Sequence, residues 1–233
     1  MPDEVIDLDH EEYSKNFGIY EQHAQDSPGP AARFSKRELT ELSISIVVMS
    51  IAFSFIFADD MMFLFRGEIS PLAISFIVVG TAFVFHEMGH KFMAQRYGLW
   101  AEFRMWKEGL LLALILPIIT AGNFVFAAPG AVHISGANIS RKVDGITSLA
   151  GPVINILLGV IFFACLVMLI IIGIEGFLWN LCAYGLIINL WLAAFNLLPF
   201  PPLDGHAIMR WNPLVWGIIA VPLFLIFVLL FFF

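Results

Sequence analysis

The sequence predicts an all-α polytopic membrane protein with about five to six transmembrane helices and one short re-entrant or β-hairpin element. Its hydrophobic fraction is 60% and its charged fraction is 13%, about half the charged share of a typical soluble domain. Several apolar runs approach or exceed the ~20 residues that a helix needs to cross a bilayer. We therefore expect the chain to lie in a lipid bilayer.

Six apolar stretches are the candidate membrane elements: Leu42–Ala58, Pro71–Phe92, Leu110–Ala128, Leu149–Ile174, Phe177–Leu198 and Leu214–Phe233. The gaps between them hold most of the remaining charge, and Lys and Arg favour the cytoplasmic side of a membrane. Arg33, Lys36 and Arg37 come just before the first stretch. The sequence therefore predicts a multi-pass protein of the cell membrane with a cytoplasmic N-terminus.

The first 41 residues differ in composition from the rest of the chain. Residues 1–41 contain ten acidic and four basic side chains, so they hold nearly all of the chain's net charge of −7. They include the run Ser27-Pro28-Gly29-Pro30 and show no sustained apolar period. Such a segment is typical of a disordered, solvated tail. We predict a cytoplasmic tail at 1–41 and one membrane-embedded domain at 42–233.

The third apolar stretch, Leu110–Ala128, is not expected to cross the membrane. A full crossing would place Arg141 and Lys142 outside, against the charge bias. The stretch also contains a proline and a glycine, which suit a broken backbone better than a lipid-facing helix. We predict an element that enters and leaves on the inner side, with an extended strand from Phe124 to Ile134. Irregular backbone at that depth must be buried in protein or face a wet cavity.

The second stretch contains His86-Glu87-Met88-Gly89-His90. Two histidines four residues apart project from the same face of a helix, so they can bind one metal ion. Zinc with nitrogen and oxygen ligands and one open position lowers the pKa of its bound water to about 7. Glu87 would accept that water's proton and pass it to a leaving amine. The other interpretation, two packing histidines with a paired glutamate, is disfavoured because ionisable residues inside membranes are usually functional.

A third ligand is needed, and Asp204 is the best candidate. Pro199, Pro201 and Pro202 end the preceding helix, and Gly205 permits a sharp turn. Asp204 is thereby presented at the inner end of the fifth stretch, although these residues alone fit an ordinary interfacial loop equally well. The re-entrant interpretation brings Asp204 to the same side and depth as the two histidines.

Three motifs resemble the site-2 protease family of intramembrane zinc metalloproteases, over about Pro71 to Gly205. They are His86-Glu87-Met88-Gly89-His90, Gly151-Pro152-Val153-Ile154-Asn155, and Asn196-Leu-Leu-Pro199-Phe-Pro201-Pro202-Leu203-Asp204-Gly205. The last fits the family's N-x-x-P-x-P-x-L-D-G pattern at every fixed position. The resemblance implies one Zn²⁺ per chain held by His86, His90 and Asp204, with Glu87 as the general base. It also implies a transmembrane-helix protein as the substrate.

The resemblance favours Asn155 as a catalytic donor to the substrate carbonyl or developing oxyanion. The ordinary interpretation of an amide in a membrane helix is a hydrogen bond to a neighbouring helix, and it stays open. For Asn196 the resemblance gives weaker support, and the other interpretation is that it supports the broken helix. The remaining motif residues are expected to support the backbone or the substrate: Gly151, Pro152, Pro199, Pro201 and Gly205. His133 and His206 are expected to be polar surface residues.

Two other functions compete with peptide-bond hydrolysis. An iron-dependent membrane oxidase would normally need more histidine or carboxylate ligands. A catalytically silent membrane scaffold is disfavoured by the intact His86–His90 motif and Asp204.

The basic residues near Trp100 and Trp106 indicate a membrane-surface anchor, and no nucleic-acid partner is expected. The sequence specifies neither an oligomeric state nor a particular substrate. Its extended residues between Phe124 and Ile134 could pair with an unwound substrate as an added strand.

Overall fold

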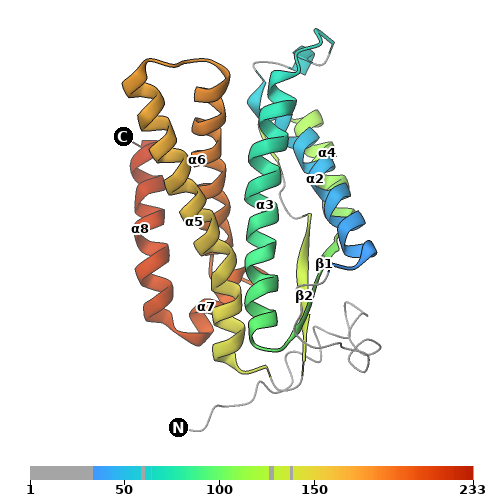
Figure 1. Ribbon diagram of the computed structural model, residues 1–233, viewed down its shortest axis with the longest axis vertical. Helices are drawn as coiled ribbons and strands as arrows, with labels where there is room; N and C mark the ends of the chain where they lie inside the picture. The colour runs from blue at the N-terminus through green and yellow to red at the C-terminus, as the bar shows by residue number, and fades with distance from the viewer. Residues whose placement is uncertain (1–33, 59–60, 64, 126–128, 137–138, 233) are drawn as a thin grey trace.

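The computed structural model describes residues 34–58, 61–63, 65–125, 129–136 and 139–232. Residues 1–33, which make up most of the predicted tail, lie outside the described residues. The long helices run roughly along one axis, with a two-stranded sheet beside the lower end of α3 (Figure 1). The predicted all-α membrane class with a small hairpin is confirmed.

Four of the described helices are long and apolar enough to cross a bilayer: α2 (Lys36–Phe57), α3 (Ser70–Arg96), α5 (Arg141–Ile172) and α6 (Phe177–Asn196). A further apolar helix, α8, spans Pro213–Phe232. The remaining helical elements are short: η1 (Met61–Phe63), α4 (Lys107–Ile119) and α7 (Asp204–Trp211). The long helices and α8 agree with the lower end of the predicted five to six spans.

The third apolar stretch forms a helix that is too short to cross. α4 has 13 residues, about 20 Å at 1.5 Å per residue, whereas a bilayer core is about 30 Å thick. Strand β1 (Trp100–Met105) precedes α4, and strand β2 (Gly130–Ser135) follows it. The strands pair antiparallel, so the chain enters and leaves this element at one end of the molecule (Figure 1). The predicted hairpin is therefore confirmed, although β2 begins six residues after the expected Phe124.

Helix α2 begins six residues before residue 42, where the sequence predicts the boundary between tail and membrane domain, and that domain division stays a prediction. α2 begins at Lys36, where the Ser35 hydroxyl accepts a hydrogen bond from the backbone N–H of Glu38 at 3.0 Å. Such a cap stabilises a helix start by about 1 kcal/mol. Glu38 and Glu41 count as solvated tail charges in the sequence, but both are buried in the fold. They are buried because each contacts a basic side chain and a strand N–H.

The core is built around α3, which contacts α2, α5, α6 and both strands. One apolar cluster joins α2, α3, α4 and α6: Met49, Phe53, Phe57, Ile74, Val78, Val79, Ala82, Leu110, Ala113 and Ile188. A second joins α6, α7 and α8: Ala193, Ala194, Leu197, Ile208, Ala220 and Leu223. The central helix is also the one that contains the two histidines of the predicted metal motif.

Candidate metal centre

The three predicted metal ligands meet where the start of α7 lies against α3. The Nε2 atoms of His86 and His90 are 3.0 Å apart. Each lies 3.3 Å from Oδ2 of Asp204. All three candidate ligand atoms lie within 4.8 Å of one another, although Asp204 is 114 residues from His90 in sequence. The geometry brings together the set that the sequence pointed to.

The other ring nitrogen of each histidine contacts an acceptor. Nδ1 of His86 lies 2.5 Å from Oδ1 of Asn155. Nδ1 of His90 lies 2.9 Å from the backbone carbonyl of Thr147. Each Nδ1 must therefore hold the proton, which leaves each Nε2 with a free lone pair in the neutral ring. Contacts of this kind orient metal-binding histidines and fix their tautomer.

The orientation of the Asn155 amide follows from its other contacts. Its Nδ2 donates to the Ala82 carbonyl at 3.0 Å and to Oδ1 of Asn189 at 3.0 Å. Asn189 is held in turn by donation from its own Nδ2 to the Gly185 carbonyl at 2.8 Å. Both amide hydrogens of Asn155 thus have acceptors, and its Oδ1 must face His86. These contacts match the interhelical interpretation of Asn155, and they leave no amide hydrogen for a substrate oxygen.

The donor set fits a cation. Two Nε2 lone pairs and one carboxylate oxygen converge, and the buried Oδ2 of Asp204 accepts no hydrogen bond among the described residues. Acceptors this close repel one another unless a positive charge lies between them. Two imidazoles and one carboxylate, with a fourth position left open, are a typical ligand set of catalytic zinc.

Two of the predicted supporting glycines allow close approach of backbone to the centre. A Cβ atom at Gly151 would lie 2.5 Å from Nε2 of His90 and 2.7 Å from Cε1 of His86. A Cβ atom at Gly205 would meet the Leu197 carbonyl, so only glycine lets α7 turn back against the end of α6. The pattern of glycines therefore reflects the packing of α5 and α7 around the ligands.

Glu87 links the metal motif to the hairpin. Its side chain is buried, and Oε2 accepts a hydrogen bond from the backbone N–H of Val132 in β2 at 3.0 Å. The candidate base is thus held beside the two histidines by the strand that the sequence expected near the site.

Comparison with known proteins identifies the family. The sequence matches the Peptidase family M50 over residues 74–175. A protein of Methanocaldococcus jannaschii named "Putative zinc metalloprotease MJ0611" is 39% identical over 191 residues, which cover 82% of this chain and 93% of that protein. The chain belongs to peptidase family M50. The resemblance to the site-2 protease family is thereby confirmed, and the chain is a zinc metalloprotease of the membrane.

Two further relatives share less of their sequence with this chain. "Putative zinc metalloprotease YwhC" of Bacillus subtilis is 32% identical over 153 residues, covering 60% of this chain and 67% of that protein. "Zinc metalloprotease MJ0392" of Methanocaldococcus jannaschii is 29% identical over 143 residues, covering 59% of this chain and 34% of that protein. No solved structure matches the chain.

The remaining residues singled out in this M50 protease lie outside the ligand cluster. Asn196 donates from Nδ2 to the Leu192 carbonyl of its own helix at 3.0 Å. Pro199 and Pro201 lie in the turn between α6 and α7, and Pro152 is buried in α5 beside Gly151. His133 lies in β2, where burial first and then nearby Arg104 lower the pKa of its imidazole. His133 is not among the three residues of the metal-ligand cluster.

Two residues that orient the metal ligands are not among the site residues predicted from the sequence. Asn189 orients Asn155, and the Thr147 carbonyl orients His90. Asn189 could have been noticed as an amide in an otherwise apolar helix, because such residues usually hydrogen-bond a neighbouring helix. Thr147 acts through its backbone, so its side-chain identity gives no signal.

Proposed function

We propose that this zinc metalloprotease cleaves peptide bonds of transmembrane-helix proteins within or beside the lipid bilayer, with one zinc ion per chain. The observation that supports it is the convergence of His86, His90 and Asp204 at the buried end of a helix long and apolar enough to span a membrane. A substrate that reaches these ligands must itself lie at or in the membrane.

In the proposed reaction the chain's own groups hold the reactants and move the protons. Bound zinc would polarise the scissile carbonyl and acidify a water molecule. Glu87 accepts a proton from the attacking water, whose oxygen bonds to the carbonyl carbon, and delivers that proton to the leaving amine as the C–N bond breaks. The Val132 N–H holds the Glu87 carboxylate in place at 3.0 Å. Asn155 is proposed to act through His86, as a positioning residue for the metal.

The proposed substrate segment binds in extended form along β2. A helical backbone does not present its carbonyl groups, so the segment must unwind before hydrolysis. Val132 is paired with Phe103 in the sheet, yet its N–H points away from β1 toward Glu87. Because N–H groups alternate along a strand, that of Ile134 points to the same edge. An extended peptide can therefore add to this edge by main-chain hydrogen bonds.

The β2 edge can be tested by removing one N–H. We expect Ile134→Pro to reduce cleavage of a membrane-embedded substrate at least tenfold, because proline cannot donate to an added strand. Ile134→Val, which keeps the N–H, is the matched control. Unchanged cleavage by the proline variant, with the substrate bound, would remove strand addition from the proposal.

The proposed protease activity is tested by combining metal analysis with Glu87→Gln. We expect about one zinc per chain in both proteins, cleavage by the unaltered chain, and no cleavage by the variant. A chelator should abolish cleavage and added zinc should restore it. Iron in place of zinc would favour a membrane oxidase, and zinc binding without any cleavage would favour a silent scaffold. Capture of membrane proteins by the Glu87→Gln form would then identify the substrate.

A further inference from the structure

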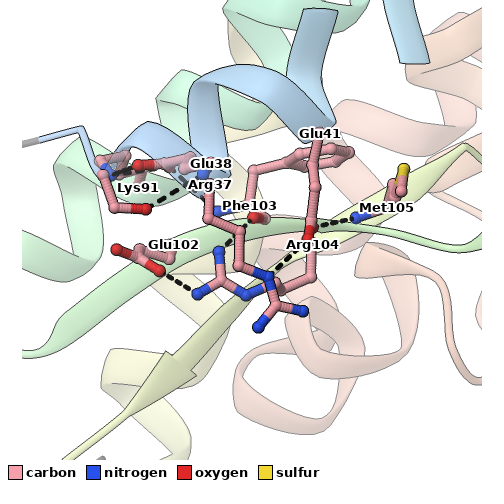
Figure 2. Close-up of polar contacts among 9 residues, drawn as sticks. Arg37, Glu38, Glu41, Lys91, Glu102, Phe103, Arg104 and Met105 are labelled. Carbon is pink, nitrogen blue, oxygen red and sulfur yellow. Dashed lines mark hydrogen bonds and ion pairs between the residues drawn. The ribbon is translucent and has the colours of Figure 1, made fainter. Parts of the chain in front are cut away.

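Two glutamates of α2 occupy the outer edge of strand β1, as Figure 2 shows. Oε1 of Glu38 accepts a hydrogen bond from the backbone N–H of Phe103 at 3.0 Å. Oε2 of Glu41 accepts one from the backbone N–H of Met105 at 3.1 Å. Phe103 and Met105 are two residues apart, so both N–H groups point away from β2. Glu38 and Glu41 are three apart and face the same side of their helix.

Glu38 also forms an ion pair with α3. Nζ of Lys91 lies 2.7 Å from Oε1 and 2.6 Å from Oε2 of Glu38. Both side chains are 0% exposed, and the Lys91 ammonium lies 4.5 Å from the centre of the Phe34 ring. Lys91 directly follows the metal ligand His90 in the chain. One carboxylate therefore joins α2, the first strand of the hairpin and the metal-binding turn of α3 (Figure 2).

The carbonyl of Phe103 on the β1 edge also has a partner, which is a basic side chain. Nη1 of Arg104 donates to the Phe103 carbonyl at 2.9 Å and its Nη2 contacts Glu102. Nε of Arg37 donates to Oε1 of Glu41 at 2.6 Å. Both outward-facing polar groups of Phe103 thus have partners. A peptide cannot pair with this edge of the hairpin unless it displaces a buried carboxylate.

A fully buried ion pair contributes little to the net stability of a fold. Desolvation of the two charges offsets most of their attraction, and apolar residues of similar size often stabilise a fold equally well. The position of this pair suggests a geometric role, because it ties the hairpin to the turn that holds His90. Displacement of β1 would displace β2, and with it the Val132 N–H that contacts Glu87.

We infer that Glu38 and Glu41 are positioning residues for the protease: they close the outer edge of β1 and set the distance between the β2 edge and the metal centre. The inference rests on the proposed function, in which an extended substrate adds to β2. It makes two glutamates of α2 part of the substrate-binding site, although neither contacts the metal ligands.

The test compares two double variants, Glu38→Gln/Lys91→Met and Glu38→Leu/Lys91→Met. Neither leaves a buried charge without its partner. They differ in one respect, since glutamine keeps an oxygen that can accept from the Phe103 N–H and leucine does not. We expect the glutamine double variant to keep KM for a membrane substrate within about twofold. The leucine double variant should raise KM up to about tenfold, the equivalent of one lost hydrogen bond, with kcat and zinc content little changed.

Hydrogen exchange gives a readout that does not depend on activity. In a Glu87→Gln background, the amides of Phe103 and Met105 should exchange faster in the leucine double variant than in the glutamine double variant. Glu41→Leu and Glu41→Gln repeat the comparison at Met105 and leave the ion pair of Glu38 and Lys91 intact. They replace the double variants if those fail to fold. Arg37→Gln is the control, because it removes the charge of the exposed Arg37 and leaves the Glu41 carboxylate on the strand.

The outcomes separate the inference from the proposed function. Equal KM and equal exchange in the leucine and glutamine variants would overturn the inference. A leucine variant that loses kcat, zinc and thermal stability together would also overturn it, because the contact would then be structural only. Absence of zinc-dependent cleavage by the unaltered chain would instead contradict the proposed function, while the exchange comparison would still test whether the glutamates hold the hairpin.

Discussion

At the scale of single residues, the centre depends on which nitrogen of each histidine is protonated. Asn155 accepts from His86, and its own amide is oriented by Ala82 and Asn189. We expect Asn155→Ala to weaken zinc binding by about 10- to 100-fold, the usual effect of removing a residue that orients a metal ligand. Zinc competition with a fluorescent chelator measures it. Asn180→Ala is the control: Asn180 is exposed near the start of α6, and the variant should bind zinc as tightly as the unaltered chain.

Gly151 allows a second test of the ligand geometry. In Gly151→Ala the new methyl group would lie 2.5 Å from one ligand nitrogen and 2.7 Å from the neighbouring ring, so a ring or α5 must move. We expect loss of bound zinc and of cleavage, measured by metal analysis and by substrate turnover. Gly217→Ala is the control, because a Cβ atom there meets nothing within 4 Å. Full zinc content in Gly151→Ala would show that the ligands do not converge as described.

The ligands could be predicted from sequence because their signals are local. His86 and His90 are one helical turn apart, and Asp204 lies in a run of prolines with a fixed pattern. Glu38 gave no such signal, because its partner Lys91 is 53 residues away. Without that partner, an acidic residue in an acidic segment is expected in solvent.

At the scale of elements, the hairpin was predictable and one of its strands was not. Charge bias and broken backbone both indicated that Leu110–Ala128 returns to the side it entered from. β1 was interpreted as part of a basic anchor between Trp100 and Trp106. Its residues alternate between buried positions (Ala101 and Phe103) and partly exposed ones, a pattern too short to distinguish a strand from an interfacial loop. Pairing with β2 across more than twenty residues decides its structure.

The last helix is expected to support the metal centre through the turn that holds Asp204. Nε1 of Trp216 in α8 donates to the Leu197 carbonyl at 2.7 Å, and that carbonyl is the group packed against Gly205. Trp216→Phe removes the hydrogen bond and keeps an aromatic ring. We expect zinc affinity to fall about fivefold, because a lost hydrogen bond is worth about 1 kcal/mol. Trp179→Phe, at the exposed start of α6, is the control; equal affinity in both variants would show that α8 is dispensable for the centre.

At the scale of the whole molecule, the fold and the charge bias require the same orientation. The hairpin does not cross, so the ends of α3 and α6 and the start of α5 lie on one side of the bilayer. Basic residues concentrate on that side, and we propose that it is the cytoplasmic side, because Lys and Arg favour that side of a membrane. The metal centre would then lie inside the membrane near its cytoplasmic face, since the ligands are in the last turns of α3 and the first turn of α7.

Single cysteines can test this orientation in a Cys165→Ser/Cys182→Ser background. A membrane-impermeant maleimide added to intact cells should label Glu68→Cys and Glu175→Cys, both exposed in connections at the outer end. Arg96→Cys and Lys142→Cys, exposed on either side of the hairpin, should react only after permeabilisation. A full crossing by α4 would place Arg96 and Lys142 on opposite sides, and only one of them would then be protected. That result would also separate Asp204 from the two histidines across the bilayer, so protection of both positions supports the hairpin and the ligand set together.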